Sequence, residues 1–278
     1  MSVKLGIIGG GVMGEALLSR LISQETYEPA EVLVGEKSPE RRSRLAQQYG
    51  VAVTEDNRSV VLDASVLLLA IKPQVFGQVT AELATSLKAQ ASTPLIVSIL
   101  AGVSLQQLET AFEQRPVIRA MPNTPATVGA GMTAIALGAL ATDRDRQIAL
   151  QLFAAVGKVV EVPESLIDAV TGLSGSGPAY VALMIEALAD GGVAAGLPRA
   201  IAYQLALQTV HGTVQLLQET RMHPAELKDQ VTSPGGTTIA GVTELERGGF
   251  RASLIQAVQA AAKRSHELGT QSKEQGAR

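Results

Sequence analysis

Residues 9–14 of this 278-residue chain read Gly-Gly-Gly-Val-Met-Gly and match the pattern G-x-G-x-x-G. A short apolar segment precedes them and a segment with helical spacing follows, as in a strand–turn–helix unit. In such a unit Gly9 allows the tight turn, Gly11 lets backbone N–H groups approach a pyrophosphate, and Gly14 lets the helix pack closely on the strand. The helix N-terminus adds partial positive charge. The pattern predicts a site for a nicotinamide-type dinucleotide; the alternative is a glycine-rich turn of an ordinary α/β protein.

Short apolar runs alternate with helical patterns as far as residue 162. The run 66–70, Val-Leu-Leu-Leu-Ala, is apolar on both faces, as expected of a central strand in a parallel sheet. Strands that alternate with helices favour βαβ units and a mostly parallel sheet covered on both faces. The candidate strands are 4–8, 32–35, 51–54, 66–70, 95–100, 117–121, 132–136 and 158–162.

The alternation stops after Pro163, and the rest of the chain has helical patterns alone. Several of these segments are apolar around most of their circumference, which is typical of helices that pack against each other or against a second subunit. We therefore predict an α/β fold, with an N-terminal Rossmann-type doubly wound sheet over 1–162 and an all-helical domain over 163–278. The predicted helices of the second domain are 164–173, 178–195, 198–219, 224–231, 238–246 and 251–268.

Composition excludes several classes of function. The chain is 46% hydrophobic, carries a formal net charge of −3 and contains no cysteine. It therefore has no disulfide and no thiol nucleophile, and its three scattered histidines do not suggest a metal site. The near-balance of charge argues against nucleic-acid and membrane-surface partners. The N-terminal apolar run is too short for a signal peptide, so we expect a soluble, cytoplasmic protein.

The end of the second predicted strand selects between NAD and NADP. Glu36 lies 22 positions after Gly14, where a carboxylate would bind the ribose 2′-hydroxyl and repel a 2′-phosphate. The basic and hydroxyl side chains that follow could instead bind that phosphate with charge-assisted hydrogen bonds. These residues are Lys37, Ser38, Arg41 and Arg42. An exposed helix face explains the two arginines equally well, so the sequence leaves the choice of cofactor open.

Three further clusters place rigid turn residues beside polar ones. Residues 70–74 and 121–125 each follow a predicted strand, at the end where doubly wound sheets bind their ligands. The run 231–241 in the helical half is rich in hydroxyl groups and glycine, which suits either an anion such as a carboxylate or a capped helix start. This loop offers no strong base of the kind that alcohol dehydrogenases use. It would suit reduction of an already electrophilic bond, such as a protonated imine, where the protein chiefly orients its partners.

Together these motifs resemble one family, the pyrroline-5-carboxylate reductases. The resemblance runs from the glycine turn nearly to residue 269. The motifs that carry it are Ala-Ile-Lys-Pro-Gln (70–74), Ser-Ile-Leu-Ala-Gly (98–102), Arg-Ala-Met-Pro-Asn-Thr-Pro (119–125), Ser-Gly-Ser-Gly-Pro-Ala-Tyr (174–180) and Lys-Asp-Gln-Val-Thr-Ser-Pro-Gly-Gly-Thr-Thr (228–238). The last two are distinctive of the family.

The resemblance implies reduction of L-1-pyrroline-5-carboxylate to L-proline, the last step of proline biosynthesis, with NADP(H) or NAD(H). It implies that backbone N–H groups of one loop hold the substrate carboxylate and that Thr238 faces the ring nitrogen as the catalytic residue. The implied substrate-binding residues are Ser233, Pro234, Gly235, Gly236, Thr237 and Thr238. The cofactor-binding residues, together with the glycine turn, are Gly9, Gly11, Val12, Met13, Gly14, Glu36, Lys37, Asn57, Ala70, Ile71, Lys72, Pro73, Ala101, Met121 and Asn123.

The resemblance also implies homodimers that interleave their helical domains, which in this family often assemble into larger rings such as decamers.

One position departs from the family pattern. The family often has a small polar or basic residue where this chain has Glu36, which puts a strict preference for NADP in doubt.

Two other functions compete with this interpretation. A β-hydroxyacid dehydrogenase shares the domain order, but its Gly-x-Gly-x-x-x-Lys motif would place a catalytic lysine where this chain has Val181. A dinucleotide-binding regulator that has lost turnover would be expected to show an eroded 233–238 loop, and that loop is intact.

Overall fold

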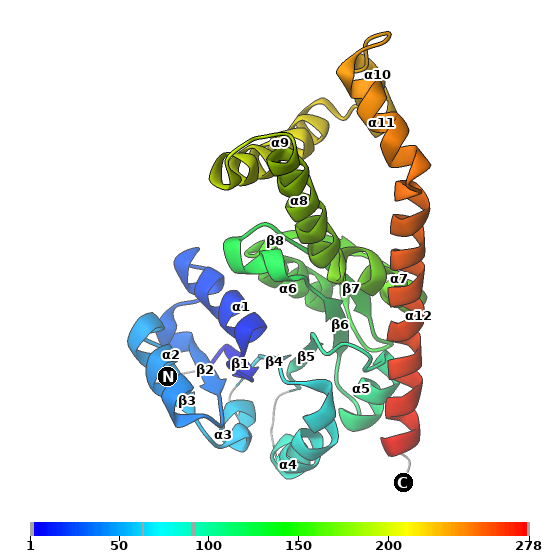
Figure 1. Cartoon of the computed structure of the whole chain (residues 1–278). Helices are drawn as coiled ribbons and strands as arrows, with labels where there is room; N and C mark the ends of the chain where they lie inside the picture. Colours follow the sequence, from blue (N-terminus) through cyan, green and yellow to red (C-terminus); the bar gives the residue numbers. More distant parts are fainter. Residues whose placement is uncertain (1–2, 63, 90–92, 277–278) are drawn as a thin grey trace. The chain divides into compact units, whose positions relative to one another are not determined.

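The computed structural model describes residues 3–62, 64–89 and 93–276. Contacts between Cα atoms divide the chain into two compact units. The first comprises Met1–Gly175 with Ala260–Arg278, and the second comprises Ser176–Gln259 (Figure 1). The chain therefore leaves the first unit once and returns to it within its last helix.

The first unit contains an eight-stranded sheet in the order β3-β2-β1-β4-β5-β6-β7-β8. The first six strands are parallel, β7 runs antiparallel to β6, and β8 is parallel to β7. This arrangement confirms the predicted Rossmann-type doubly wound sheet, which has the strand order 3-2-1-4-5-6. The strands are β1 (Leu5–Ile8), β2 (Val32–Gly35), β3 (Ala52–Thr54), β4 (Val66–Leu69), β5 (Leu95–Ser98), β6 (Val117–Met121), β7 (Gly131–Leu137) and β8 (Gly157–Glu161).

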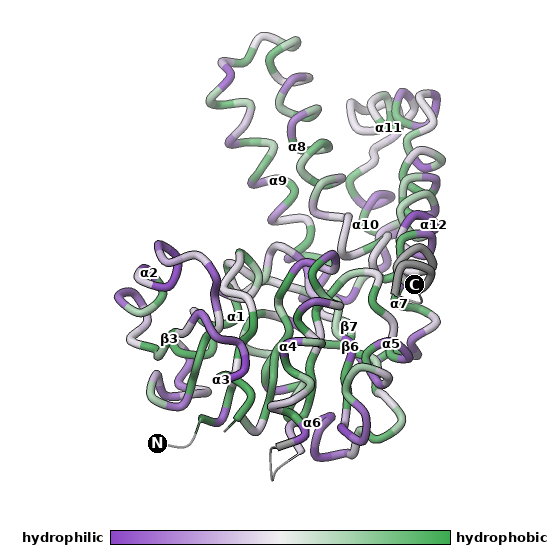
Figure 2. Tube along the Cα trace, turned by 90° about the horizontal axis from the view of Figure 1, so that it is seen from below, coloured by the Kyte–Doolittle hydropathy of each residue, from purple (hydrophilic) through white to green (hydrophobic). Residues whose placement is uncertain are grey.

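Helices cover both faces of the sheet because alternate residues of each strand point to opposite sides. In β4, Val66 and Leu68 belong to one buried cluster, whereas Leu67 and Leu69 belong to the other. The strands are mostly hydrophobic in Figure 2, whereas α2 is largely hydrophilic. The first face is covered by α1 (Val12–Ser23), α2 (Pro39–Tyr49) and α6 (Asp143–Ala154), and the second by α3 (Asn57–Leu62), α4 (Phe76–Ala89), α5 (Leu105–Ala111) and α7 (Ile167–Val170).

The register places the carboxyl ends of the central strands at one edge. Ile8 of β1 lies opposite Gly35 of β2 and Leu69 of β4, and Leu69 lies opposite Ser98 of β5. From β1 the chain adds β2 and β3 on one side of the sheet and then returns to add β4 on the other side of β1. The direction in which strands are added therefore reverses at β1. Ligands of doubly wound sheets bind at such a point, beyond the carboxyl ends of the strands.

The first unit extends past the predicted boundary between residues 162 and 163. Ile167 of α7 is buried in the second cluster of the core. The Asp168 carboxylate accepts a 2.7 Å hydrogen bond from Ser265 and lies 3.2 Å from Nδ1 of His266. These contacts fix α7 to the sheet and residues 265–266 of the last helix to α7, which is followed by the π-helical turn Thr171–Gly175. The contact-based division therefore differs from the predicted one, whose residues 277–278 lie outside the described part of the chain.

The second unit is helical. Its tightest contact joins α8 and α9 through Ala189, Ala202 and Ala206, whose small side chains let the two helices approach closely. Other apolar side chains of these helices remain exposed, among them Leu183 at 67% and Tyr203 at 53%. The helices are α8 (Gly177–Ala194), α9 (Arg199–Thr220), α10 (Pro224–Gln230), α11 (Thr237–Arg247) and α12 (Phe250–Gly276), the last of which continues beyond its predicted end at 268.

Within the residues that the structure describes, we find no helix with the length and apolar character needed to cross a bilayer.

Candidate active site

The glycine turn joins β1 to α1 at the carboxyl edge of the sheet. Gly9 has a φ of +103°, and a Cβ atom there would lie 2.6 Å from the Ala70 carbonyl oxygen. A Cβ atom at Gly14 would lie 2.2 Å from the Gly9 carbonyl oxygen. Gly11 is the N-cap residue of α1, and a Cβ atom there would contact nothing within 4 Å. Two glycines are thus required by the fold, whereas Gly11 leaves the helix N-terminus open to a phosphate group.

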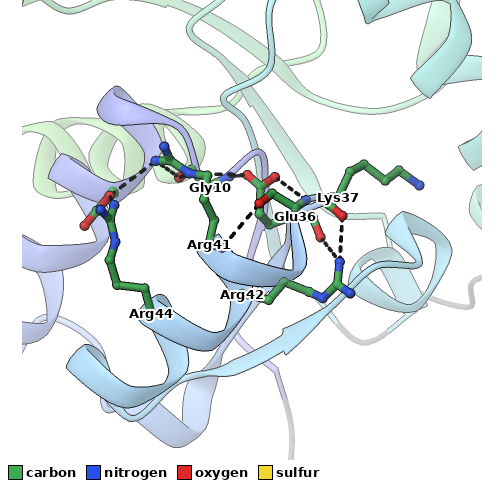
Figure 3. Close-up of polar contacts among 8 residues, drawn as sticks. Gly10, Glu36, Lys37, Arg41, Arg42 and Arg44 are labelled. Carbon is green, nitrogen blue, oxygen red and sulfur yellow. Dashed lines mark hydrogen bonds and ion pairs between the residues drawn. The ribbon is translucent and has the colours of Figure 1, made fainter.

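Glu36 follows β2 and lies against the glycine turn (Figure 3). One carboxylate oxygen accepts a 3.0 Å hydrogen bond from the Gly10 N–H group, and the other accepts a 2.9 Å bond from Ser38. The Glu36 side chain is 14% exposed. This position beside the turn fits the predicted contact with a ribose hydroxyl.

The arginines of α2 are engaged with the backbone around this carboxylate. Arg41 donates from Nε and Nη2 to the Gly10 carbonyl oxygen at 3.0 and 2.5 Å. Arg42 donates to the carbonyl oxygens of Glu36 and Lys37, both at 2.8 Å (Figure 3). Arg41 therefore fastens the start of α2 to the glycine turn, and Arg42 fastens it to the segment that follows β2.

Asn57 and its neighbours border the same end of β2. Asn57 is 3% exposed, and its amide donates a 3.0 Å hydrogen bond to the Glu82 carboxylate on α4. The other oxygen of Glu82 lies 3.3 Å from the Lys37 ammonium group. Nearby, the Arg58 guanidinium donates a hydrogen bond that lowers the pKa of Asp56 below its ordinary value. Charged groups of both signs thus surround the region where the resemblance places the adenosine.

The other predicted cofactor residues follow β4, β5 and β6. Ala70 donates its N–H group to the Ile8 carbonyl oxygen at 2.8 Å, which ties the 70–73 segment to β1. The Asn123 amide donates to the Ser174 carbonyl oxygen at 3.0 Å, and its oxygen accepts from the Met132 N–H group at 2.8 Å. The sheet therefore brings 9–14, Glu36, 70–73, Ala101 and 121–123 to one edge, and it uses the Asn123 side chain to brace the loop after β6.

A partly buried ion pair, which no sequence motif indicated, lies near this edge. Arg119 of β6 is 7% exposed and donates a 2.9 Å hydrogen bond to Glu164. The same Glu164 oxygen accepts a 2.6 Å bond from the N–H group of Leu105, which begins α5 directly after the loop that contains Ala101. Arg119 and Glu164 are 45 positions apart, so no local pattern reveals their pairing.

The hydroxyl-rich loop belongs to the second unit, between α10 and α11. Gly235 has a φ of +66°, and Gly236 is the N-cap residue of α11. A Cβ atom at Gly236 would lie 2.3 Å from the Ser233 hydroxyl oxygen and 3.1 Å from the Ser233 carbonyl oxygen, so a side chain there would displace the Ser233 hydroxyl group. Gly236 has no side chain that could cap the first N–H groups of α11. Thr237 and Thr238 form the first turn of the helix, and Thr238 is half-buried.

In the part of the chain that the structure describes, no three His, Cys, Asp or Glu side chains gather in a way that could hold a metal ion.

Comparison with known proteins assigns a family. Residues 164–268 match the model of the pyrroline-5-carboxylate reductase dimerisation domain, and residues 4–102 match that of coenzyme F420-dependent NADP oxidoreductases. The pyrroline-5-carboxylate reductase of Synechocystis sp. is 61% identical over 97% of this chain and 99% of its own. The chain belongs to the pyrroline-5-carboxylate reductase family. The Arabidopsis thaliana and Escherichia coli members are 47% and 43% identical, each over 96% of this chain and over 96% and 99% of their own sequences.

Solved structures of the family have the same fold over nearly the whole chain. The reductase from Coxiella burnetii is 35% identical, with a TM-score of 0.89 over 96% of this chain and 99% of its own. The Plasmodium falciparum enzyme, solved with NADP bound, is 29% identical, with a TM-score of 0.85 over 96% of this chain and 98% of its own.

Proposed function

We propose that this protein reduces L-1-pyrroline-5-carboxylate to L-proline with NADPH or NADH. The observation that carries this proposal is the similarity to the pyrroline-5-carboxylate reductase of Synechocystis sp., which is 61% identical over 97% of this chain. The glycine turn and the 233–238 loop support this proposal, because each leads into a helix whose first N–H groups have no side-chain cap.

The residues at the carboxyl edge of the sheet fit a dinucleotide. N–H groups of Gly11, Val12 and Met13 would bind the pyrophosphate at the N-terminus of α1. Glu36 would bind the adenosine ribose, with Lys37 and Asn57 beside it. The segment 70–73, Ala101, Met121 and Asn123 would border the nicotinamide half. When bound, the reduced nicotinamide supplies the hydride that C5 of the ring imine accepts.

The 233–238 loop fits the carboxylate of the substrate. A negative group is stabilised at the N-terminus of α11, where backbone N–H groups lack intrahelical partners. Thr238 would donate its hydroxyl hydrogen bond to the nitrogen of the neutral imine and relay to it a proton drawn from solvent. Once the nitrogen is protonated, the Thr238 hydroxyl oxygen would accept a hydrogen bond from its N–H group. A threonine hydroxyl is a weak acid, so its role is to orient the protonated imine rather than to act as a strong acid.

Self-association would proceed through the second unit. Its residues lie within the segment that matches the family's dimerisation domain, and large apolar side chains such as Leu183 and Ile255 are exposed there. Exposed apolar surface of this extent is typical of an interface. We propose that dimers assemble further into a ring such as a decamer, that the protein acts in the cytoplasm, and that its partner is a small molecule rather than nucleic acid.

The test is a spectrophotometric assay at 340 nm with pyrroline-5-carboxylate and each reduced cofactor in turn. Thr238→Ala should lower kcat by about tenfold or more, because loss of one hydrogen bond of about 1.4 kcal/mol in the transition state has that effect. Affinity for the dinucleotide should change little. Thr243→Ala is the matched control, since Thr243 lies on the same helix and donates to the Ile239 carbonyl oxygen. Absence of turnover in the wild type would refute the function, and wild-type kinetics in Thr238→Ala would refute the role of its hydroxyl.

A further inference from the structure

Lys37 is the basic side chain at the end of β2 that is most easily released. Its ammonium group lies 3.0 Å from the Glu55 carbonyl oxygen and 3.3 Å from the Glu82 carboxylate. The Lys37 side chain is 63% exposed. Figure 3 shows that it extends away from the glycine turn, in contrast to Arg41. An ion pair this exposed is weak and exchanges its partner readily.

Glu82 is the fixed member of this pair. Its side chain is 23% exposed, and its second oxygen accepts a 3.0 Å hydrogen bond from the Asn57 amide. Asn57 is itself 3% exposed, and the oxygen of its amide lies against Gly35 at the end of β2. Glu82 is therefore held by a buried amide, whereas Lys37 can swing away from it.

The arginines nearby are not equivalent to Lys37. Arg41 donates twice to the Gly10 carbonyl oxygen and pairs with Glu15 at 3.3 Å. Arg42 donates to two backbone carbonyl oxygens and pairs with Glu55 at 3.1 Å. Moving Arg41 would break the hydrogen bonds that hold α2 to the glycine turn, and moving Arg42 would break those that hold α2 to residues 36 and 37.

The difference between the two cofactors is a phosphate on the adenosine ribose. A phosphate monoester carries a charge of about −1.5 to −2 at neutral pH and needs a cation to replace its water. Lys37 follows Glu36 directly, so it is placed to meet that phosphate if it leaves Glu82. NADH needs no cation at this position, because it has a ribose 2′-hydroxyl in place of the phosphate and that hydroxyl binds a carboxylate.

We propose that Glu82 is a positioning residue that sets the ratio of NADPH to NADH use by competing with the 2′-phosphate for Lys37. This inference rests on the proposed dinucleotide site at the end of β2. Glu82 acts from α4, 45 positions beyond Lys37, and does not itself contact the cofactor. NADPH binding exchanges one ion pair of Lys37 for another, whereas NADH binding leaves the pair with Glu82 intact.

The test uses Glu82→Gln in the full chain, because glutamine keeps an acceptor for Asn57 and removes the charge. Binding of 2′,5′-ADP and of 5′-AMP is measured by calorimetry at low ionic strength. We expect the Kd for 2′,5′-ADP to fall by about threefold to fivefold and the Kd for 5′-AMP to change by less than about twofold. The gain for 2′,5′-ADP should shrink at high salt.

Two further variants separate this mechanism from a general change of charge. Glu40→Gln removes a carboxylate from the first turn of α2, where the Glu40 side chain makes no hydrogen bond or ion pair with the described residues. It should give a smaller gain than Glu82→Gln. Lys37→Met should weaken binding of 2′,5′-ADP, and in this background Glu82→Gln should no longer tighten it.

The proposal is overturned if Glu82→Gln tightens both nucleotides equally or neither, if Glu40→Gln gives the same gain, or if the gain persists without Lys37. If Glu82→Gln does not fold, Lys37→Met still tests the proposal. Unchanged binding of 2′,5′-ADP by Lys37→Met would exclude Lys37 as the phosphate ligand and so overturn the proposal. These titrations contain no pyrroline-5-carboxylate. Failure of the reductase assay would therefore leave their outcome intact, and their failure would leave the reductase function standing.

Discussion

Replacing Glu164 by glutamine tests how much the partly buried ion pair of Arg119 and Glu164 contributes to stability. The Arg119 side chain is 9% exposed and that of Glu164 is 32% exposed. Removing one partner of a buried pair costs about 3–5 kcal/mol, because the other charge is left without compensation. Two features reduce this cost: about a third of the Glu164 side chain is exposed to solvent, and glutamine still offers an acceptor to the Leu105 N–H group. We therefore expect Glu164→Gln to lower the free energy of unfolding by about 2–3 kcal/mol.

The assay is urea unfolding followed by circular dichroism at one fixed protein concentration, because self-association makes apparent stability depend on concentration. Glu161→Gln is the matched control. Glu161 pairs with Arg146, and the two side chains are 37% and 39% exposed. An exposed pair of this kind contributes about 1 kcal/mol or less, so the control should be nearly neutral.

A second substitution tests the physical cause. If the loss arises from an uncompensated cation, Arg119→Met in the Glu164→Gln background should recover part of it, because methionine fills the space without a charge. The argument fails if Glu164→Gln costs no more than Glu161→Gln. It also fails if the double variant is no more stable than Glu164→Gln alone.

Four other substitutions test the carboxyl edge of the sheet and its surroundings. Gly9→Ala should lower the free energy of unfolding by about 2 kcal/mol or more, because a side chain at φ +103° is strained and meets a backbone carbonyl. Gly11→Ala should unfold like the wild type yet bind NADPH more weakly in a fluorescence titration; normal binding would contradict the role of that open position. Glu36→Ser should raise the ratio of kcat/KM for NADPH over NADH, because a carboxylate repels a 2′-phosphate, and an unchanged ratio would count against it. Arg58→Met should raise the pKa of Asp56 in an NMR titration. Because folding lowers this pKa, the stability that the pair contributes is present above the ordinary carboxyl pKa and is lost as the pH falls towards the folded-state value.

Local patterns in the sequence predicted the elements and one part of the candidate site. All eight strands were predicted within a few residues, because apolar runs and turn residues act over short distances along the chain. The glycine turn was predicted for the same reason. Gly9 and Gly14 are needed because a side chain at either position would collide with backbone atoms close by in the structure. The family, too, was recognised from contiguous motifs such as 228–238, and the comparisons confirmed it.

The partners of the charged side chains were decided by the tertiary structure. The sequence left Arg41 and Arg42 as either phosphate ligands or an exposed face, but the fold brings their guanidinium groups to backbone carbonyl oxygens. Neither the pair of Lys37 with Glu82 nor that of Arg119 with Glu164 has a local signature. The physical reason is that periodicity and turn chemistry depend on neighbours along the chain, whereas these pairings depend on strand order and register, which bring together residues 45 positions apart.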